Sequence, residues 1–232
     1  EAGHNEEFAH AGLKLVLRGA VDGIIVSTIL VSVIDAAGWS SRFSPLCGVG
    51  VVACWALFLA SKEALENVTY REHYSRERRR EKWELENYPE GEVDEMVQLY
   101  MKKGLKEPTA KACVEAMATE PNFFVDVMML EELQMAPPAE VNGIESAARV
   151  GGGCVVCGAL PTVAYATCVT AFATSTAYIL SLLLATAALC FLGVRRAAIT
   201  HMGKRALAGQ TVGLLLPCVL LARMLGAHLM KQ

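Results

Sequence analysis

The sequence predicts an all-α membrane protein with five transmembrane helices and a helical domain inserted between the second and third. Two observations lead to this fold class. Of the 232 residues, 53% are hydrophobic and only 19% are charged, and the mean hydropathy is positive. Most of the charge is also confined to one block, about residues 66–145. Such a composition fits a membrane protein with one soluble part better than a soluble globule.

Five stretches are long and apolar enough to cross a bilayer, which takes about 20 residues per helix. They cover approximately residues 13–34, 45–65, 144–163, 171–194 and 207–229. We therefore expect three parts: residues 1–65 with the first two spans, residues 66–145 as the inserted domain, and residues 146–232 with the last three spans. The start of the sequence is acidic rather than basic, which does not favour a cleaved signal peptide.

Lysine and arginine are distributed unequally between the two sides of the predicted membrane. One side receives the charged block together with Lys14, Arg18, Arg195, Arg196, Lys204 and Arg205. The opposite side receives Arg42 and Lys231. Because basic residues favour the cytosolic side, we expect the N-terminus and the inserted domain to be cytosolic. The C-terminus is then expected to face a lumen or the outside.

Within the charged block the pattern predicts four helices, over residues 69–86, 92–103, 108–119 and 122–135. The first has neither glycine nor proline and is expected to continue directly from the second span. The stretch "NYPEG" at 87–91 is expected to break it. The second helix has acids in its first turn, lysines in its last turn and Gly104 after it, as the helix dipole favours.

Four glutamates flank that break, as two pairs spaced i, i+3: Glu81, Glu84, Glu92 and Glu95. Each pair shares one helix face, and an antiparallel hairpin would bring the two pairs together. Converging carboxylates repel one another, so they indicate a bound cation or bound protons. The alternative is a solvated acidic face paired with nearby basic residues such as Lys82.

The segment "FFVDVMMLEELQM" at 123–135 combines soft sulfur with hard carboxylate. Met128 and Met129 precede Glu132 by one helical turn, so all three side chains can share one side. Thioether and carboxylate ligands together suit a divalent ion such as Fe²⁺ better than Mg²⁺ or Ca²⁺. The alternative is that both methionines fill a core while Glu131 and Glu132 face water.

Asp22 lies about 12 Å into the first span, at about 1.5 Å per residue. A carboxylate at that depth costs on the order of 3 kcal/mol and usually marks an ion or proton path. A structural ion pair with Arg18, one turn earlier, is the alternative. Cys154 and Cys157 have metal-ligand spacing, but they lie in an apolar run and are expected to pack as small hydrophobes.

Several stretches carry a family resemblance: "DGIIVST", "HYSRERRREKWELE", "FFVDVMMLEEL", "GALPTVAY" and "GKRALAGQTVG". In order and spacing they resemble the vacuolar iron transporter family over nearly the whole chain. The resemblance implies a homodimer in the membrane of a vacuole or another acidic organelle. Its implied activity is the exchange of cytosolic Fe²⁺, and often of other divalent transition metals such as Zn²⁺, Mn²⁺ or Co²⁺, for protons. It implies no enzymatic activity, prosthetic group or nucleic-acid partner.

By motif position, the resemblance implies metal ligands on the cytosolic domain at Glu81, Glu84, Glu92, Glu95, Met128, Met129 and Glu132. It implies a transport pathway past Asp22 and Glu63. Where the family often has a glutamate and a methionine in the second span, this sequence has Val51 and Leu59. That departure favours a second interpretation, a membrane-anchored metal-binding or interaction protein with little or no transport. Small residues in the first and third spans, such as Gly19 and Gly23, allow close helix approach in the expected homodimer.

Overall fold

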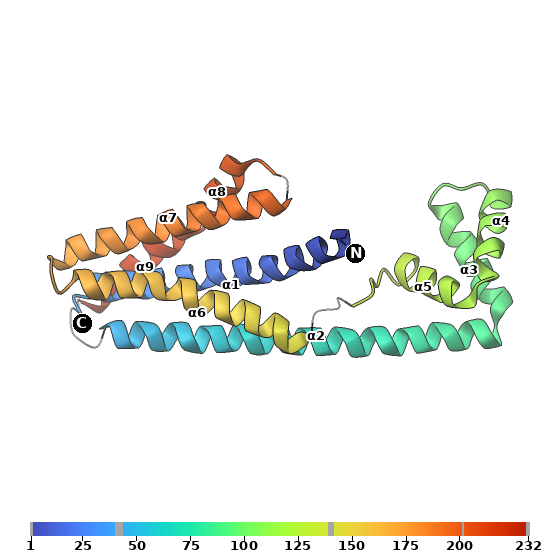
Figure 1. Ribbon diagram of the computed structural model, residues 1–232, viewed down its shortest axis with the longest axis horizontal. Helices are drawn as coiled ribbons and strands as arrows, with labels where there is room; N and C mark the ends of the chain where they lie inside the picture. The colour runs from blue at the N-terminus through green and yellow to red at the C-terminus, as the bar shows by residue number, and fades with distance from the viewer. Residues whose placement is uncertain (1, 40–43, 139–141, 201, 231–232) are drawn as a thin grey trace. The chain divides into compact units, whose positions relative to one another are not determined.

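The protein is all-helical throughout the part described by a computed structural model (Figure 1), with no strand in that part. The structure describes residues 2–39, 44–138, 142–200 and 202–230, with side chains from Gly12 in the first helix and from Cys47 in the second. Arg42 and Lys231, used above to predict orientation, lie outside these ranges. The chain forms two compact units, residues 1–65 with 141–232 and residues 66–140, which are described separately below.

The first unit contains the helices that are long and apolar enough to cross a membrane. These are α1 (Ala2–Ala36), the first part of α2 (Ser44–Asn87), α6 (Gly143–Cys168), α7 (Thr174–Thr200), and the pair α8 (Lys204–Gly213) and α9 (Leu215–Leu229). Among the described residues the candidate spans number five, counting α8 and α9 as one, and each contains an apolar stretch of 18 residues. The prediction of an all-α protein with five candidate membrane spans is therefore confirmed.

Helix α1 forms the core of this unit because α6, α7 and α9 all pack against it. Leu17 and Ile24 of α1 are buried against Leu189 of α7 and Val219 of α9. A Ser181 hydroxyl on α7 donates a 2.8 Å hydrogen bond to the Pro161 carbonyl on α6. Three helices, α6, α7 and α9, thus pack around one central helix.

Glycines allow α1 and α6 to approach backbone to backbone. A Cβ atom added at Gly19 would lie 1.9 Å from the Val150 carbonyl oxygen, and one at Gly23 would lie 2.3 Å from that of Cys154. A Cβ at Gly153 would lie 2.3 Å from the Val16 carbonyl oxygen. Gly19 and Gly23, which suggested contact between two copies, therefore serve helix packing inside one chain.

The fifth span differs from its predicted form because it is interrupted at Leu214, between α8 and α9. Pro217 lies in the first turn of α9. Its missing N–H removes the hydrogen bond to the carbonyl four residues earlier, and its ring crowds that carbonyl. A proline is well tolerated only in the first turn of a helix, so a new helix begins just before it.

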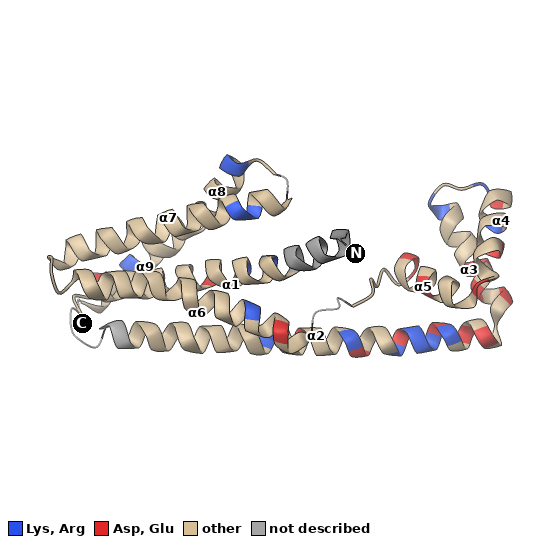
Figure 2. Cartoon of the chain, viewed as in Figure 1, with Lys and Arg blue, Asp and Glu red and all other residues tan. Residues whose placement is uncertain are grey.

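The second unit consists of the later part of α2, α3 (Pro89–Lys102), α4 (Glu107–Ala118) and α5 (Pro121–Glu131). Figure 2 shows that acidic and basic residues are concentrated on these helices and sparse on α6, α7 and α9. The core of this unit joins α3, α4 and α5 through Met96, Val114, Phe124 and Met128, all completely buried.

Two helix boundaries in this unit differ from the sequence predictions. Only Tyr88 separates α2 from α3, because Pro89 occupies the first turn of α3 instead of ending a helix. Helix α5 ends at Glu131, four residues before the predicted end at Met135. Gln134 adopts a positive φ of 54°, and the Met135 N–H bonds back to the Met129 carbonyl at 2.8 Å. This closing turn leaves Glu132 at the end of the helix.

Candidate metal centre

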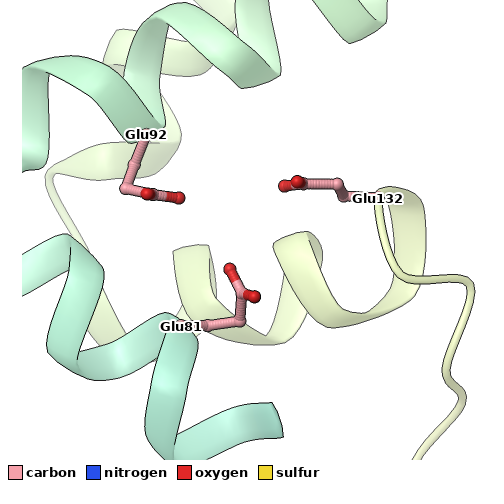
Figure 3. A group of neighbouring side chains, drawn as sticks. All are labelled: Glu81, Glu92 and Glu132. Carbon is pink, nitrogen blue, oxygen red and sulfur yellow. The ribbon is translucent and has the colours of Figure 1, made fainter.

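Three glutamates from three helices direct their carboxylates toward one another in the second unit (Figure 3). Glu81 belongs to α2, Glu92 to the first turn of α3, and Glu132 caps the end of α5. One carboxylate oxygen from each lies within 4.8 Å of the others. Spacing of that order is short enough for one divalent cation to contact all three residues.

The packing of α5 on α2 positions two of the three carboxylates. Met129 of α5 is buried against Tyr74 of α2. One turn further along α2, the Arg78 guanidinium donates two hydrogen bonds to one Asp126 oxygen, at 3.0 and 2.9 Å. These contacts align the two helices, and the turn after α5 then brings Glu132 beside Glu81.

The short break at Tyr88 positions the third carboxylate. The Glu92 N–H donates to the Tyr88 carbonyl at 3.3 Å, so α3 starts almost immediately after α2 ends. Glu92 thereby occupies the first turn of α3, where it is buried. A longer linker would not hold Glu92 so close to Glu81.

The three carboxylates are poorly neutralised by the surrounding protein. Glu81 is 2% exposed and Glu92 is 8% exposed. Arg80 donates a 2.7 Å hydrogen bond to Glu81. One Glu132 oxygen is buried and has no hydrogen-bond partner among the described residues. Buried carboxylates that lack partners are expected to bind a cation or to remain protonated.

The pKa values of the cluster reflect this crowding. Burial, followed by the charges of Glu81, Glu84, Glu95 and Glu132, raises the pKa of Glu92 to about 7. Burial is also the main cause of the raised pKa of Glu132, with Glu81 the next cause. Near neutral pH the cluster therefore holds protons that a divalent cation would displace.

Glu84 and Glu95, which the sequence analysis placed in the same ligand set, lie at the edge of the cluster. Their charges raise the Glu92 pKa, so both lie close to it. The Glu84 side chain is 34% exposed and lies 3.7 Å from Arg80, while Glu95 is exposed. They add negative charge around the three converging carboxylates without joining them.

The two predicted methionine ligands lie in apolar surroundings. Met128 packs against Met96 and Phe124 in the core of the unit, and Met129 packs against Tyr74. Both are completely buried. These positions match the core alternative stated above, and a role for either sulfur in binding metal stays a prediction.

The two predicted pathway residues lie in the first unit. The Arg18 guanidinium of α1 pairs with the Glu63 carboxylate of α2. Asp22 is half-buried and lines a cavity with Lys14 and Arg196. Among the described residues no ion pair joins Arg18 to Asp22, so the structural pair considered above is replaced by the Arg18–Glu63 pair.

Sequence reasoning missed a second ion pair in the apolar helices. Arg223 of α9 donates a 3.0 Å hydrogen bond to Asp35 near the end of α1, and its guanidinium lies 4.7 Å from the centre of the Tyr178 ring. The Tyr178 hydroxyl is in turn 3.2 Å from the Ser32 hydroxyl. Two opposite charges inside apolar segments were the available signal, because such residues usually pair.

Comparison with known proteins finds relatives that are named vacuolar iron transporters. A vacuolar iron transporter of Plasmodium falciparum is 32% identical over 132 residues, which cover 56% of this chain and 48% of that protein. Vacuolar iron transporter 1 of Arabidopsis thaliana is 27% identical over 164 residues, covering 70% of this chain and 66% of that protein. A vacuolar iron transporter of Toxoplasma gondii is 32% identical over 122 residues, covering 52% of this chain and 40% of that protein.

This chain thus spans between 40% and 66% of the length of these relatives. All three are named as transporters and none as an enzyme. The model of the VIT family matches residues 13–227. Because that match covers most of the chain, the chain belongs to the VIT family.

Proposed function

We propose that this protein moves Fe²⁺, and also Zn²⁺, Mn²⁺ or Co²⁺, from the cytosol into a vacuole-like acidic compartment in exchange for protons. The observation that carries the proposal is the convergence of the buried Glu81, Glu92 and Glu132 carboxylates. Membership of the VIT family, with relatives named vacuolar iron transporters, supports the same activity. The metal is the cargo, and no prosthetic group takes part.

In this proposal the unit of residues 66–140 is cytosolic and collects the metal. Glu81, Glu92 and Glu132 are the primary ligands, while Glu84 and Glu95 raise the local concentration of cations. Met128 and Met129 become ligands only if their side chains leave the apolar clusters, which is more favourable for soft ions than for Mn²⁺. The basic residues at the ends of the spans support a cytosolic N-terminus and a lumenal C-terminus.

The membrane step is assigned to Asp22 and Glu63. Metal competes with Arg18 for the Glu63 carboxylate, since both are cations that the same group can hold. Asp22, half-buried in α1, then binds the metal until a proton from the acidic side replaces it. A homodimer would provide the path, and the exposed apolar side chains of Val51, Trp55 and Phe58 on α2 support contact with a second copy.

The test is metal uptake by proteoliposomes containing the full chain, with Fe²⁺, Mn²⁺, Zn²⁺ or Co²⁺ and with or without a pH gradient. We expect uptake only with the gradient, and its loss in Asp22→Asn. A Glu81→Gln/Glu92→Gln variant should need more metal for half-maximal uptake. Glu86→Gln is the matched control, because Glu86 is 63% exposed and pairs with Lys82 outside the cluster. If Glu86→Gln raised the metal concentration for half-maximal uptake as much as Glu81→Gln/Glu92→Gln does, the proposed site would be contradicted.

A second candidate function is membrane-anchored metal binding without transport. The observation in its favour is the apolar character of α2, where residues 47–61 include no charged side chain. Leu59 is buried against Ala56, Val150 and Cys154. Two results together would establish this second function instead. The protein would bind metal, with weaker binding in Glu81→Gln, and it would show no uptake under any gradient.

A further inference from the structure

A second charged site lies within the first unit, in a cavity of about 420 Å³ formed by α1, α7 and the residue that joins α8 to α9. Its size falls within the range of about 300–1,000 Å³ that is typical of small-molecule sites. Three basic residues line it, Lys14 and Arg18 from α1 and Arg196 from α7. Val21 and Leu214 contribute apolar wall.

The charge in this cavity favours an anion. Arg18 is engaged by Glu63, and Asp22 is the one carboxylate among the described residues that line the cavity. Neither Lys14 nor Arg196 forms an ion pair with another described residue. Lys14 lies two helical turns before Asp22, about 12 Å along α1. An anion held by Lys14 and Arg196 therefore avoids most of the repulsion from Asp22.

The guanidinium and ammonium groups that line the cavity indicate which class of anion it binds. Guanidinium and ammonium groups are the usual partners of phosphate oxygens. Basic pockets between membrane helices bind phosphate-bearing lipid headgroups, and the apolar wall of this cavity can accommodate the adjoining alkyl chain. A divalent metal is disfavoured beside Lys14 and Arg196, although Asp22, assigned above to the metal path, lines the same cavity about two turns further along α1. This separates the cavity from the carboxylate cluster of the other unit.

We propose that this cavity binds a phosphate group, held by Lys14 and Arg196, that belongs to an anionic phospholipid or to a soluble phosphate ester. The two sources share the chemistry of a phosphate oxygen on a basic side chain. They differ in whether a lipid chain is needed for binding. Arg18 and Asp22, which the proposed metal path uses, also line this cavity. Lys14 and Arg196 are not ligands in that path, so phosphate binding by these two residues can be tested without metal.

Native mass spectrometry of the 232-residue chain in detergent tests the proposal. The probes are phosphatidylglycerol, phosphatidylcholine and glycerol 3-phosphate. We expect phosphatidylglycerol to bind more tightly than phosphatidylcholine. Arg196→Gln should weaken this binding about fivefold, since a basic residue at an anionic headgroup contributes a factor of that order. Lys14→Gln should act in the same direction.

Arg195→Gln is the matched control. Arg195 precedes Arg196 on α7, is also exposed, and does not line the cavity. Its replacement removes the same charge and should leave phosphatidylglycerol binding unchanged. If glycerol 3-phosphate also binds, and Arg196→Gln weakens its binding, the ligand is a soluble phosphate ester. If only phosphatidylglycerol binds and is weakened by Arg196→Gln, the ligand is a phospholipid. Equal losses in Arg195→Gln and Arg196→Gln, or equal binding of the two lipids, would overturn the proposal.

Discussion

Replacing Glu92 with glutamine should stabilise the second unit at neutral pH in the absence of metal. The folded-state pKa of Glu92 is about 7, raised from 4.5 by burial and by neighbouring carboxylates. A carboxyl group with a raised pKa contributes its full stability below pH 4.5. That stability is lost as the pH rises from 4.5 through 7, because in this range folding requires the ionised carboxylate of the unfolded chain to take up a proton. Above pH 7 folding buries the charged carboxylate instead.

The size of the effect follows from the two pKa values. The difference between about 7 and 4.5, at about 1.36 kcal/mol per pH unit, is roughly 3 kcal/mol. The raised pKa of Glu132 acts in the same direction. Glutamine has almost the same shape and carries no charge, so Glu92→Gln should remove this loss. Above pH 7 the variant should then be more stable than the unchanged protein by about that amount.

Hydrogen exchange of the full chain in detergent, with a chelator present, measures this locally. Peptides from α3 and α5 should lose protection between pH 5 and pH 8 in the unchanged protein, after correction for the intrinsic exchange rate. They should lose much less protection in Glu92→Gln. The exposed Glu86, on the same domain, provides Glu86→Gln as the control. Identical pH profiles for all three proteins would refute the conclusion that the raised pKa of Glu92 destabilises the folded unit at neutral pH.

Three further results are expected. Affinity for Co²⁺, measured by calorimetry on the full chain, should rise about tenfold from pH 6 to pH 8 as Glu92 loses its proton, and Glu92→Gln should flatten this slope. Gly153→Ala should lower the melting temperature in detergent, because its Cβ would meet the Val16 carbonyl oxygen at 2.3 Å. Gly152→Ala should be harmless, since no atom lies within 4 Å of its added Cβ, and equal losses would contradict this steric account. Phe124→Ala should destabilise the second unit by about 3–5 kcal/mol, since Phe124 is completely buried. Denaturant unfolding, monitored by hydrogen exchange of α3, measures this loss. A loss under 1 kcal/mol would show that this core tolerates a cavity.

The sequence alone determined the helical class and the number of candidate spans. Both follow from one-dimensional properties, the length of apolar runs and the placement of helix-breaking residues. The pairing of Glu81 with Glu84 and of Glu92 with Glu95 on shared helix faces also followed from periodicity. Periodicity does not show which member of each pair points inward, and the structure brings Glu81 and Glu92 together but not Glu84 or Glu95.

Only the tertiary structure decided which distant residues meet. Glu132 joins the cluster because α5 ends at Glu131 and packs along α2, whereas the sequence predicted a helix continuing to Met135. Arg18 pairs with Glu63, 45 positions away, rather than with Asp22 one turn along its own helix. Local spacing favoured the nearer partner, but the fold brings Glu63 of α2 within reach of Arg18, a contact that no helical pattern reveals. Helix packing sets such contacts, because it depends on side-chain shape and on backbone approach at residues such as Gly153 rather than on sequence separation.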